Sequence, residues 1–451
     1  MILVYTRIPK KGIDFLKIFD ILFLEQMFGG VTMNNYPKRN ILCIDLKSFF
    51  ASCECIDKGL NPFEYPLVVA NPNQGDGAIT LAVTPYLKKQ GVKSRGRLYE
   101  IPKNIKYYIA KPRMSLYIEK SKEVVGVYLD FISEEDLYIY SIDECFLDVT
   151  NYLKLYKMTD LELGQKIINT IYEKTKLTVT CGIGPNMLLA KIAMDIEAKH
   201  NDNNIAKWTY DDIETKLWNI KPLSKMWGIG PRMEKNLNKL GIYSVKDLAI
   251  TNKHLLKDKF GIMGIELWNH ANGIDLSKIS DHKVLAKEES FSHSQVLFKD
   301  YNEDNVKIII QEMIDVLTAR LRKSKKLTSC IGLGIGYSRV VGGGFYHNIK
   351  LDNATDSKDE ILKYCYLLFD KFYEDNPIRK VSISLGRLQK CESKQLNLFE
   401  SEDKIIKDKN INNTIDEIKI KYGKNSLLTG SNLLEDSTAI ERNKKIGGHS
   451  E

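Results

Sequence analysis

The chain has 451 residues, with 66 Lys and Arg against 58 Asp and Glu and a formal net charge of +8. That length is enough for several domains, and a composition of 43% hydrophobic and 27% charged residues excludes a chain that is disordered throughout. The small positive surplus permits a polyanionic partner without requiring one, because local clustering of charge matters more than the sum.

The cysteine spacing argues against a zinc-binding protein, and the apolar N-terminal stretch argues against a membrane-spanning one. The eight cysteines form no CxxC pair, which argues against a structural zinc site, and several lie in apolar runs typical of a reducing compartment. Residues 13–24 are interrupted by Asp14, Lys17 and Asp20 and are too few to span a bilayer. We therefore expect a soluble, cytoplasmic protein.

Residues 1–32 differ in character from the rest of the chain. Gly29-Gly30 stands just before Met33, as a purine-rich ribosome-binding site would read if it were translated. We expect Met33 to be the natural start and residues 1–32 to be a gene-calling artefact; a genuine N-terminal helix is the alternative.

The structured elements begin near residue 40. Short apolar runs predict strands at 41–44, 65–70, 137–140, 146–149 and 177–183, and helical periodicity predicts helices at 161–175 and 186–199. Residues 213–280 read as short helices punctuated by glycine, residues 290–390 as a βαββαβ pattern, and the polar residues past Cys391 as a linker-like tail. This mixture, with at least one hairpin, predicts an α+β fold.

Acidic residues stand where predicted strands end. Asp45 follows the strand 41–44, and Asp143-Glu144 lies at the tip of a hairpin-like pair. Carboxylates clustered beside buried strands require a cation, and Mg²⁺ prefers carboxylate and phosphate oxygens. Two such ions about 3.5–4 Å apart serve phosphoryl transfer. As an isolated dipeptide, Asp143-Glu144 is more simply a polar turn, so these acids alone do not decide the function.

Four longer motifs place the acids in context. Residues 40–54, NILCIDLKSFFASCE, resemble the first motif of Y-family (translesion) DNA polymerases, and residues 141–148, SIDECFLD, resemble the second metal motif of that family. Residues 91–94 resemble its fingers motif and residues 181–193 its last palm motif. The four motifs occur in the family's order, and their residues are most similar to those of the UmuC-like branch of Gram-positive bacteria.

The resemblance implies a multidomain right-hand polymerase. Its parts would be a ferredoxin-like palm, small fingers, a helical thumb with a helix–hairpin–helix, and a βαββαβ little finger. The expected ranges are an N-terminal extension at 1–39, palm at 40–56 and 115–206, fingers at 57–114, thumb at 207–285, little finger at 290–390 and tail at 391–451.

The resemblance also implies the catalytic residues. Asp45, Asp143 and Glu144, with the backbone carbonyl of Leu46, would hold two Mg²⁺ ions. Phe50 falls at the steric-gate position, where a bulky ring excludes the 2′-hydroxyl of a ribonucleotide.

Other residues would bind the incoming nucleotide. Phe49 accompanies Phe50, and one of the two rings is expected to belong to the core. Lys88 takes the place of a basic residue that grips the triphosphate.

The nucleotide site also departs from the family pattern. Met187 stands where many relatives carry a lysine, and Pro85 where many carry a tyrosine. Lys191, or Arg95 and Arg97, are candidates to supply the missing charge.

Two basic regions suggest contacts with DNA phosphates. Residues 227–232, WGIGPR, resemble a helix–hairpin–helix, in which the backbone at Gly228 and Gly230, a helix N-terminus and Arg232 bind a phosphate without reading sequence. In the predicted little finger, Arg322 and Lys323 belong to the densest basic cluster, residues 320–326. Phosphate contact is favoured there, with support from Arg339, over a solvated helix cap.

The tail contains a short linear motif. Gln395-Leu396-Asn397-Leu398-Phe399 resembles the pentapeptide by which bacterial polymerases bind the sliding clamp. Leu396, Leu398 and Phe399 would enter a pocket, and Gln395 would fix the orientation. The alternative is a strand edge that folds back on its own domain. Residues 439–449 resemble the tail of the same branch and suggest no mechanism.

These features predict a monomeric, error-prone DNA-directed DNA polymerase that extends primers on damaged templates with dNTPs, in DNA repair and the SOS response. No segment is left for a proofreading exonuclease, so low fidelity is expected. A nucleotidyl cyclase is one alternative, although it needs neither a helix–hairpin–helix nor a clamp peptide. A non-catalytic DNA-binding accessory subunit is another, although it would be expected to lose its metal ligands; Met187 alone favours it.

Overall fold

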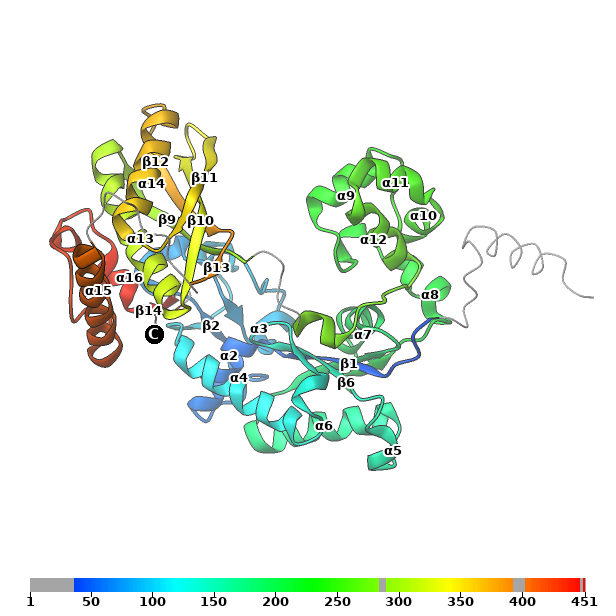
Figure 1. Ribbon diagram of the computed structural model, residues 1–451. Coiled ribbons are helices and arrows are strands. Elements are labelled where there is room, and N and C mark those ends of the chain that lie inside the picture. The colour runs from blue at the N-terminus through cyan, green and yellow to red at the C-terminus, as the bar shows by residue number, and fades with distance from the viewer. Residues whose placement is uncertain (1–35, 284–288, 392–401, 447–448, 451) are drawn as a thin grey trace, which may run out of the picture. The chain divides into compact units, whose positions relative to one another are not determined.

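The computed structural model describes residues 36–283, 289–391, 402–446 and 449–450. The predicted start at Met33 and the predicted clamp peptide, residues 395–399, lie outside these ranges. The chain forms two compact units, Met1–Lys111 with Leu116–Lys283 and Pro112–Ser115 with Val284–Glu451 (Figure 1). Within the described ranges, no helix is long and apolar enough to cross a membrane.

The first unit is built on a five-stranded sheet in the order β5-β6-β1-β7-β8. Its strands are β1 (Ile41–Leu46), β5 (Leu137–Ile139), β6 (Glu144–Asp148), β7 (Val179–Gly184) and β8 (Ile205–Lys207). β1 lies in the middle, antiparallel to both β6 and β7, and its first four residues are fully buried. A central strand covered on both faces requires the continuous apolar run that the sequence has there.

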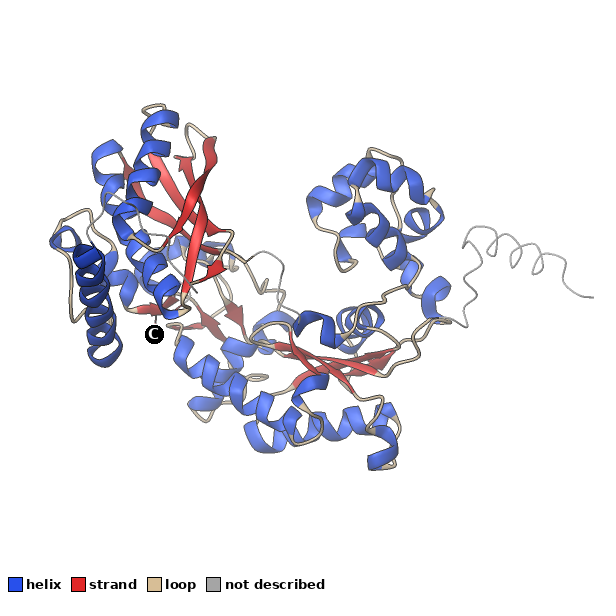
Figure 2. Ribbon diagram, viewed as in Figure 1, coloured by secondary structure: helices blue, strands red, loops and turns tan. Residues whose placement is uncertain are grey.

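Helices cover both faces of this sheet (Figure 2). They are α4 (Met114–Leu129), α6 (Asp160–Thr175) and α7 (Met187–Ala193), which continues as a π-helical turn, Met194–Ala198. The short helix α5 (Leu153–Tyr156) packs on α6, and α2 (Phe49–Asp57) leads from β1 to the small sheet described below. α7 lies directly on the backbone of β7, since a Cβ atom on Gly182 would be 2.1 Å from the carbonyl oxygen of Ala190. Residues of α7 therefore come close to the ends of β1 and β6.

The remaining parts of the first unit are a small sheet and a helical region. The small sheet has the order β3-β2-β4, with β2 (Leu67–Val69), β3 (Ala82–Val83), β4 (Tyr108–Ala110) and the helix α3 (Pro85–Lys89). The helical region contains α8 (Asp212–Thr215), α9 (Pro231–Asn238), α10 (Val245–Ile250), α11 (Lys253–Phe260) and α12 (Ile262–Ala271). Described residues 212–283 contain no strand, as the sequence predicts.

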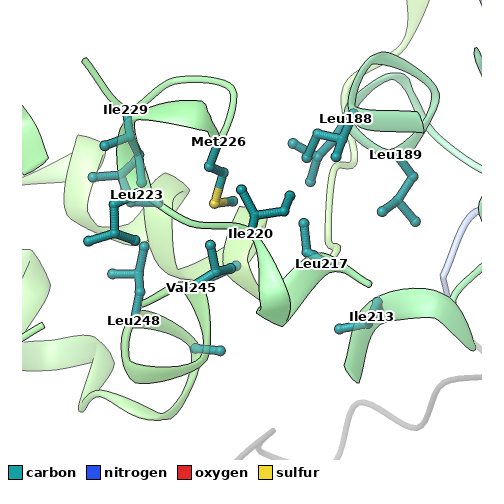
Figure 3. Close-up of a cluster of buried hydrophobic side chains, with 14 of the residues drawn as sticks. Leu188, Leu189, Ile213, Leu217, Ile220, Leu223, Met226, Ile229, Val245 and Leu248 are labelled. Atoms are coloured by element: carbon teal, nitrogen blue, oxygen red, sulfur yellow. The ribbon is translucent and has the colours of Figure 1, made fainter. Parts of the chain in front are cut away.

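The helical region shares a hydrophobic core with α7, the helix that packs on β7 of the five-stranded sheet. Figure 3 shows Leu188 and Leu189 of α7 beside Leu217 and Ile220, which lead into the helical region. The core continues through Met226 to α9 and α10, and it is buried throughout. The helix that packs on β7 is thus also an anchor of the helical region.

The second unit contains a βαββαβ domain, as predicted. Its elements are β9 (Phe291–Tyr301), α13 (Glu303–Lys323), β10 (Lys326–Tyr337), β11 (Gly344–Thr355), α14 (Lys358–Phe372) and β12 (Ile378–Gly386). The antiparallel sheet has the order β11-β10-β12-β9, and a short strand, β13 (Gln389–Lys390), pairs with β10. α13 and α14 bury one face of the sheet in a common apolar core.

The tail differs from the linker-like segment that its composition predicts. It contains α15 (Glu402–Tyr422), a 3₁₀ turn (Gly430–Leu433), α16 (Ala439–Asn443) and the small pair β14 (Lys445–Ile446) and β15 (His449–Ser450). The Glu312 side chain in α13 is 0% exposed, and its carboxylate accepts hydrogen bonds from Ser437, Thr438 and Arg442. Composition could not reveal this docking, because the carboxylate and its donors lie more than 120 residues apart.

We expect Arg442→Ala to loosen the second unit. Breaking a buried ion pair leaves an uncompensated charge and costs about 3 kcal/mol or more. Hydrogen exchange of the α13 amides, which reports local opening, should then speed up by about 10²-fold. Lys444→Ala is the matched control, because Lys444 pairs with Glu441 at the surface, where such pairs contribute at most about 1 kcal/mol. Equal exchange in the two variants would contradict the role assigned to Arg442.

Candidate active site

The sheet brings Asp45 and Glu144 together. Asp45 at the end of β1 is the direct cross-strand partner of Glu144 at the start of β6, so both side chains lie on one face of the sheet. Asp143 precedes Glu144, and its backbone carbonyl accepts a hydrogen bond from the Leu46 N–H at 2.9 Å. Residues about 100 positions apart in sequence are thereby joined at one edge, as the motifs predict.

The carboxylate of Asp143 is fixed by its own turn. Ser141 Oγ donates to Asp143 Oδ1 at 2.7 Å, and the N–H groups of Tyr140 and Ser141 both donate to the carbonyl of Glu144 at 3.0 Å. The side chain of Asp143 is half-buried, whereas that of Glu144 is buried. The predicted polar turn is therefore present, and it carries the acidic pair beside Asp45.

Lysines from α7 and the π-helical turn balance these acids. Lys191 Nζ lies 2.8 Å from Glu144 and 3.1 Å from Asp195, and Lys199 Nζ lies 2.7 Å from Asp195 and 3.4 Å from Asp45. Alternating charges thus link Glu144 to Asp45 through Asp195. Burial opposes the charged form of both lysines, but the neighbouring acidic groups, Cys43 and the carboxylates for Lys191 and the carboxylates for Lys199, outweigh it and raise the pKa of each.

Asp45 itself has a perturbed pKa. Burial raises the pKa of Asp45 to about 6, with a further contribution from the charges of Asp143 and Glu144, while Lys199 opposes the shift. The same acids affect Lys88 in α3. Desolvation lowers the pKa of Lys88, whereas the charges of Asp45 and Asp143 oppose that lowering. The acids therefore repel one another enough to favour a bound cation.

The donor set fits a divalent metal ion. Three carboxylates and the Leu46 carbonyl would supply the hard oxygen ligands that Mg²⁺ prefers. Among the described residues, no three His, Cys, Asp or Glu side chains converge to hold a metal by themselves. Two of the three carboxylates also pair with lysines, Glu144 with Lys191 and Asp45 with Lys199.

The ring of Phe50 is held in a defined orientation. Phe49 is buried in the core, while Phe50 beside it is half-buried and stacks on Tyr117 of α4, with ring centroids 4.4 Å apart. The Tyr117 hydroxyl donates to the buried Glu54 at 2.8 Å. One ring therefore belongs to the core, as predicted, and the other lies against a fixed support.

The two departures from the family pattern have structural explanations. Met187 is 1% exposed and packs with Ile41, Cys43 and Phe146, so its side chain is part of the core. Pro85 is buried at the first position of α3, where a proline is favourable because no N–H is needed. Neither residue offers a charge to a phosphate.

The predicted DNA-contacting residues lie on both units. In the first unit, Gly228 has φ +90°, which a tight turn requires, Gly230 caps α9, and Arg232 is exposed on that helix. In the second unit, Lys323 and Arg339 are exposed.

Arg322 has a partner that the sequence did not suggest. Its guanidinium forms a two-pronged ion pair with Asp416 of α15 at 2.7 and 3.0 Å, and its side chain is 14% exposed. Docking of the tail thus engages one member of the basic cluster.

Sequence reasoning missed several residues of the site. Lys199, Asp195, Tyr117 and Glu54 were not predicted, although Lys199 and Asp195 follow the last palm motif directly and lie at helical spacing from Lys191. Spacing of four residues could have indicated the ion pairs. The contact of Tyr117 with Phe50 joins residues 67 positions apart, and no local pattern indicates it.

Comparisons with known proteins agree with this architecture. The impB/mucB/samB family matches residues 44–195, its C-terminal domain matches residues 288–398, and the helix–hairpin–helix motif of the IMS family matches residues 210–242. A Y-family DNA polymerase chimera built from Dbh and Dpo4 has the same fold, with a TM-score of 0.60 and 21% identity, and the match covers 78% of this chain and 99% of the chimera.

Full-length relatives are also similar. UvrX of Bacillus subtilis strain 168, named for UV-damage repair, is 39% identical over 93% of this chain and 99% of its own length. DNA polymerase IV 2 of the same organism is 32% identical over 91% of this chain and 98% of its own length. The fold is thus a right-hand polymerase with palm, fingers, thumb and little finger, and the chain belongs to the impB/mucB/samB family of Y-family DNA polymerases, in the UmuC-like branch of Gram-positive bacteria.

Proposed function

We propose that this protein is a DNA-directed DNA polymerase of the lesion-bypass type, which extends primers across damaged templates during DNA repair and the SOS response. The observation that carries the proposal is the cross-strand pair Asp45 and Glu144, with Asp143 beside it, on the palm sheet. The names of the relatives, UV-damage repair protein and DNA polymerase IV, support the same activity.

Family membership implies a divalent metal, and we propose two Mg²⁺ ions held by Asp45, Asp143, Glu144 and the Leu46 carbonyl. Such ions supply positive charge to the triphosphate and lower the pKa of the attacking 3′-hydroxyl. The chain's own residues position the reactants, which accounts for much of the catalysis in phosphoryl transfer. Lys191 orients Glu144 through their 2.8 Å contact.

Lys88 and Lys199 are the cations best suited to bind the triphosphate. Both sense the charge of Asp45, and Lys199 lies 3.4 Å from it. Lys191, predicted from sequence for this task, also pairs with two carboxylates, but its side chain is only 9% exposed against 32% for Lys199, which favours a role in positioning the acids. Phe50 follows Asp45 by five residues in sequence and would exclude the 2′-hydroxyl of a ribonucleotide.

Template binding would rest on phosphate contacts. The turn at Gly228 and Gly230 with Arg232, together with Lys323 and Arg339 of the little finger, would bind the DNA backbone. Such contacts position DNA without reading its bases, so they tolerate a damaged template. Arg322 would contribute once its pair with Asp416 opens.

Primer extension tests the proposal. Purified full-length protein should add dNTPs to a primer on undamaged DNA with Mg²⁺, and continue past a template lesion in the presence of a loaded sliding clamp. A failure to extend under both conditions, with primer–template binding intact, would favour the non-catalytic accessory subunit. All three acids are retained, which argues against that alternative.

We further propose that Gln395–Phe399 binds the sliding clamp and that the protein acts as a monomer. The double substitution Leu398→Ala and Phe399→Ala should weaken clamp binding by at least about 30-fold, because anchor residues commonly contribute about 2 kcal/mol or more. Surface plasmon resonance on immobilised clamp measures this loss. Distributive primer extension should remain, and Asn397→Ala is the control within the same peptide. Unchanged clamp affinity would point to a different anchor.

A further inference from the structure

The indole of Trp227 connects the thumb to the palm sheet. Trp227 immediately precedes the turn at Gly228, and it is half-buried. Its Nε1–H donates to the hydroxyl of Tyr140 at 3.4 Å, and the two ring centroids are 6.1 Å apart at an edge-on angle of 74°. The imidazole of His270 in α12 stacks on the indole, with ring centroids 6.1 Å apart and an angle of 4° between the ring planes. The residue next to the predicted phosphate-binding turn therefore contacts the palm.

Tyr140 belongs to the turn that carries the acids. Its N–H donates to the Glu144 carbonyl at 3.0 Å, which closes the hairpin between β5 and β6. Its ring lies 5.7 Å from Lys191 Nζ, the ammonium that pairs with Glu144. The residue that receives the indole thus contacts the backbone of Glu144 and the cation that holds its carboxylate.

Phe146 provides a second connection between the same elements. It is fully buried on β6, two residues after Glu144, so its side chain lies on the same face of the sheet as that carboxylate. Its ring centroid is 5.8 Å from Tyr140 and 6.3 Å from Trp227. Three aromatic rings therefore join the thumb turn to the catalytic hairpin, and close-packed rings transmit displacement because they cannot be compressed.

We propose that Trp227 is a positioning residue: it couples the phosphate-binding turn of the thumb to the Asp143–Glu144 hairpin through Tyr140. DNA bound at the turn holds the indole against Tyr140, and this contact fixes the acids for catalysis. The inference rests on the proposed polymerase function. The described ring contacts of Trp227 are with Tyr140, Phe146 and His270, so its effect on the acids is transmitted through Tyr140 and Phe146.

Single-turnover primer extension with a double-mutant cycle tests the coupling. Trp227→Ala and Tyr140→Ala should each lower the maximal rate by about tenfold, since small misplacements of reacting groups are costly. The double variant should be no slower than the worse single variant, because both remove the same contact. Primer–template affinity, measured by fluorescence anisotropy, should change by less than about twofold. Additive rate losses, or losses in affinity alone, would overturn the proposal.

A spectroscopic readout covers the case in which Trp227→Ala fails to fold. The chain has four tryptophans, and Trp227→Phe keeps an aromatic ring at this position while removing one emitter. Adding dNTP with Ca²⁺ to the protein–DNA complex should change the tryptophan emission of the wild type and not that of Trp227→Phe. The same change in both proteins, or none in the wild type, would count against the coupling.

Two controls distinguish a failure of this inference from a failure of the proposed function. Tyr172→Ala, which removes an exposed aromatic ring of α6, should keep the wild-type rate. A wild-type protein that fails to extend a primer would contradict the polymerase activity. An active wild type whose Trp227 and Tyr140 variants behave additively would contradict the coupling alone.

Discussion

Asp143→Ala is expected to lower the single-turnover rate of primer extension by about 10³-fold or more. Loss of a carboxylate that holds a catalytic metal removes several kcal/mol of charge stabilisation, and each 1.4 kcal/mol is tenfold in rate. The half-buried side chain has one described hydrogen bond, from Ser141, so the hairpin should keep its fold. The rate is measured with Mg²⁺ and saturating dNTP, and primer–template affinity by anisotropy, which should stay within about twofold.

Asp148→Asn is the matched control for Asp143. Asp148 ends β6, the strand that begins directly after Asp143; it pairs in register with Ile41 at the far end of β1 and accepts hydrogen bonds from Thr150. Its loss should leave the rate unchanged, because it lies away from Asp45 and Glu144. If Asp143→Ala were no slower than this control, the carboxylate would not belong to the catalytic set, and the accessory-subunit alternative would regain support.

Phe50→Ala is expected to relax sugar selectivity. The phenyl ring is fixed by stacking on Tyr117, which the buried Glu54 holds, so the ring cannot easily move away from an added hydroxyl. Forcing an extra atom into a packed site costs about 1–3 kcal/mol. Removal of the ring should therefore raise incorporation of ribonucleotides relative to deoxynucleotides by roughly 10- to 100-fold, measured as the ratio of kcat/KM for rNTP and dNTP.

Phe49→Leu distinguishes a gate from a general loss of packing. Phe49 is 3% exposed and contributes to the core, so this substitution should lower stability without changing the sugar ratio. An unchanged ratio in Phe50→Ala, or an equal change in Phe49→Leu, would remove the gate role from Phe50.

Much of the active site was predictable because short motifs encode it. The apolar run 41–44 ending in Asp45 is typical of a buried strand with a carboxylate at its end, and Asp143-Glu144 stands at the start of a second buried run, β6. The glycines of the last palm motif are required because α7 packs on the β7 backbone with no room for a side chain. Where local chemistry fixes the backbone, local sequence predicts it.

Contacts between distant residues could not be predicted in this way. Composition suggested a linker for the tail, yet Ser437, Thr438 and Arg442 satisfy one buried carboxylate, Glu312. The ion pair of Arg322 with Asp416 and the support of Phe50 by Tyr117 have the same character. Each depends on which surfaces meet, and no periodicity or propensity along the chain records that.

The net charge of +8 permits binding to DNA but does not show which part of the protein would bind it. Motifs of a few residues indicated the family and predicted the acidic ligands and the phosphate-binding turn, because each requires particular residue types at fixed spacing. The folded structure shows which lysine pairs with which acid and which ring supports Phe50. It also shows how Trp227 contacts the hairpin that carries Asp143 and Glu144. These pairings depend on the packing of separate elements, because electrostatic and aromatic contacts act over a few ångströms in space whatever their separation along the chain.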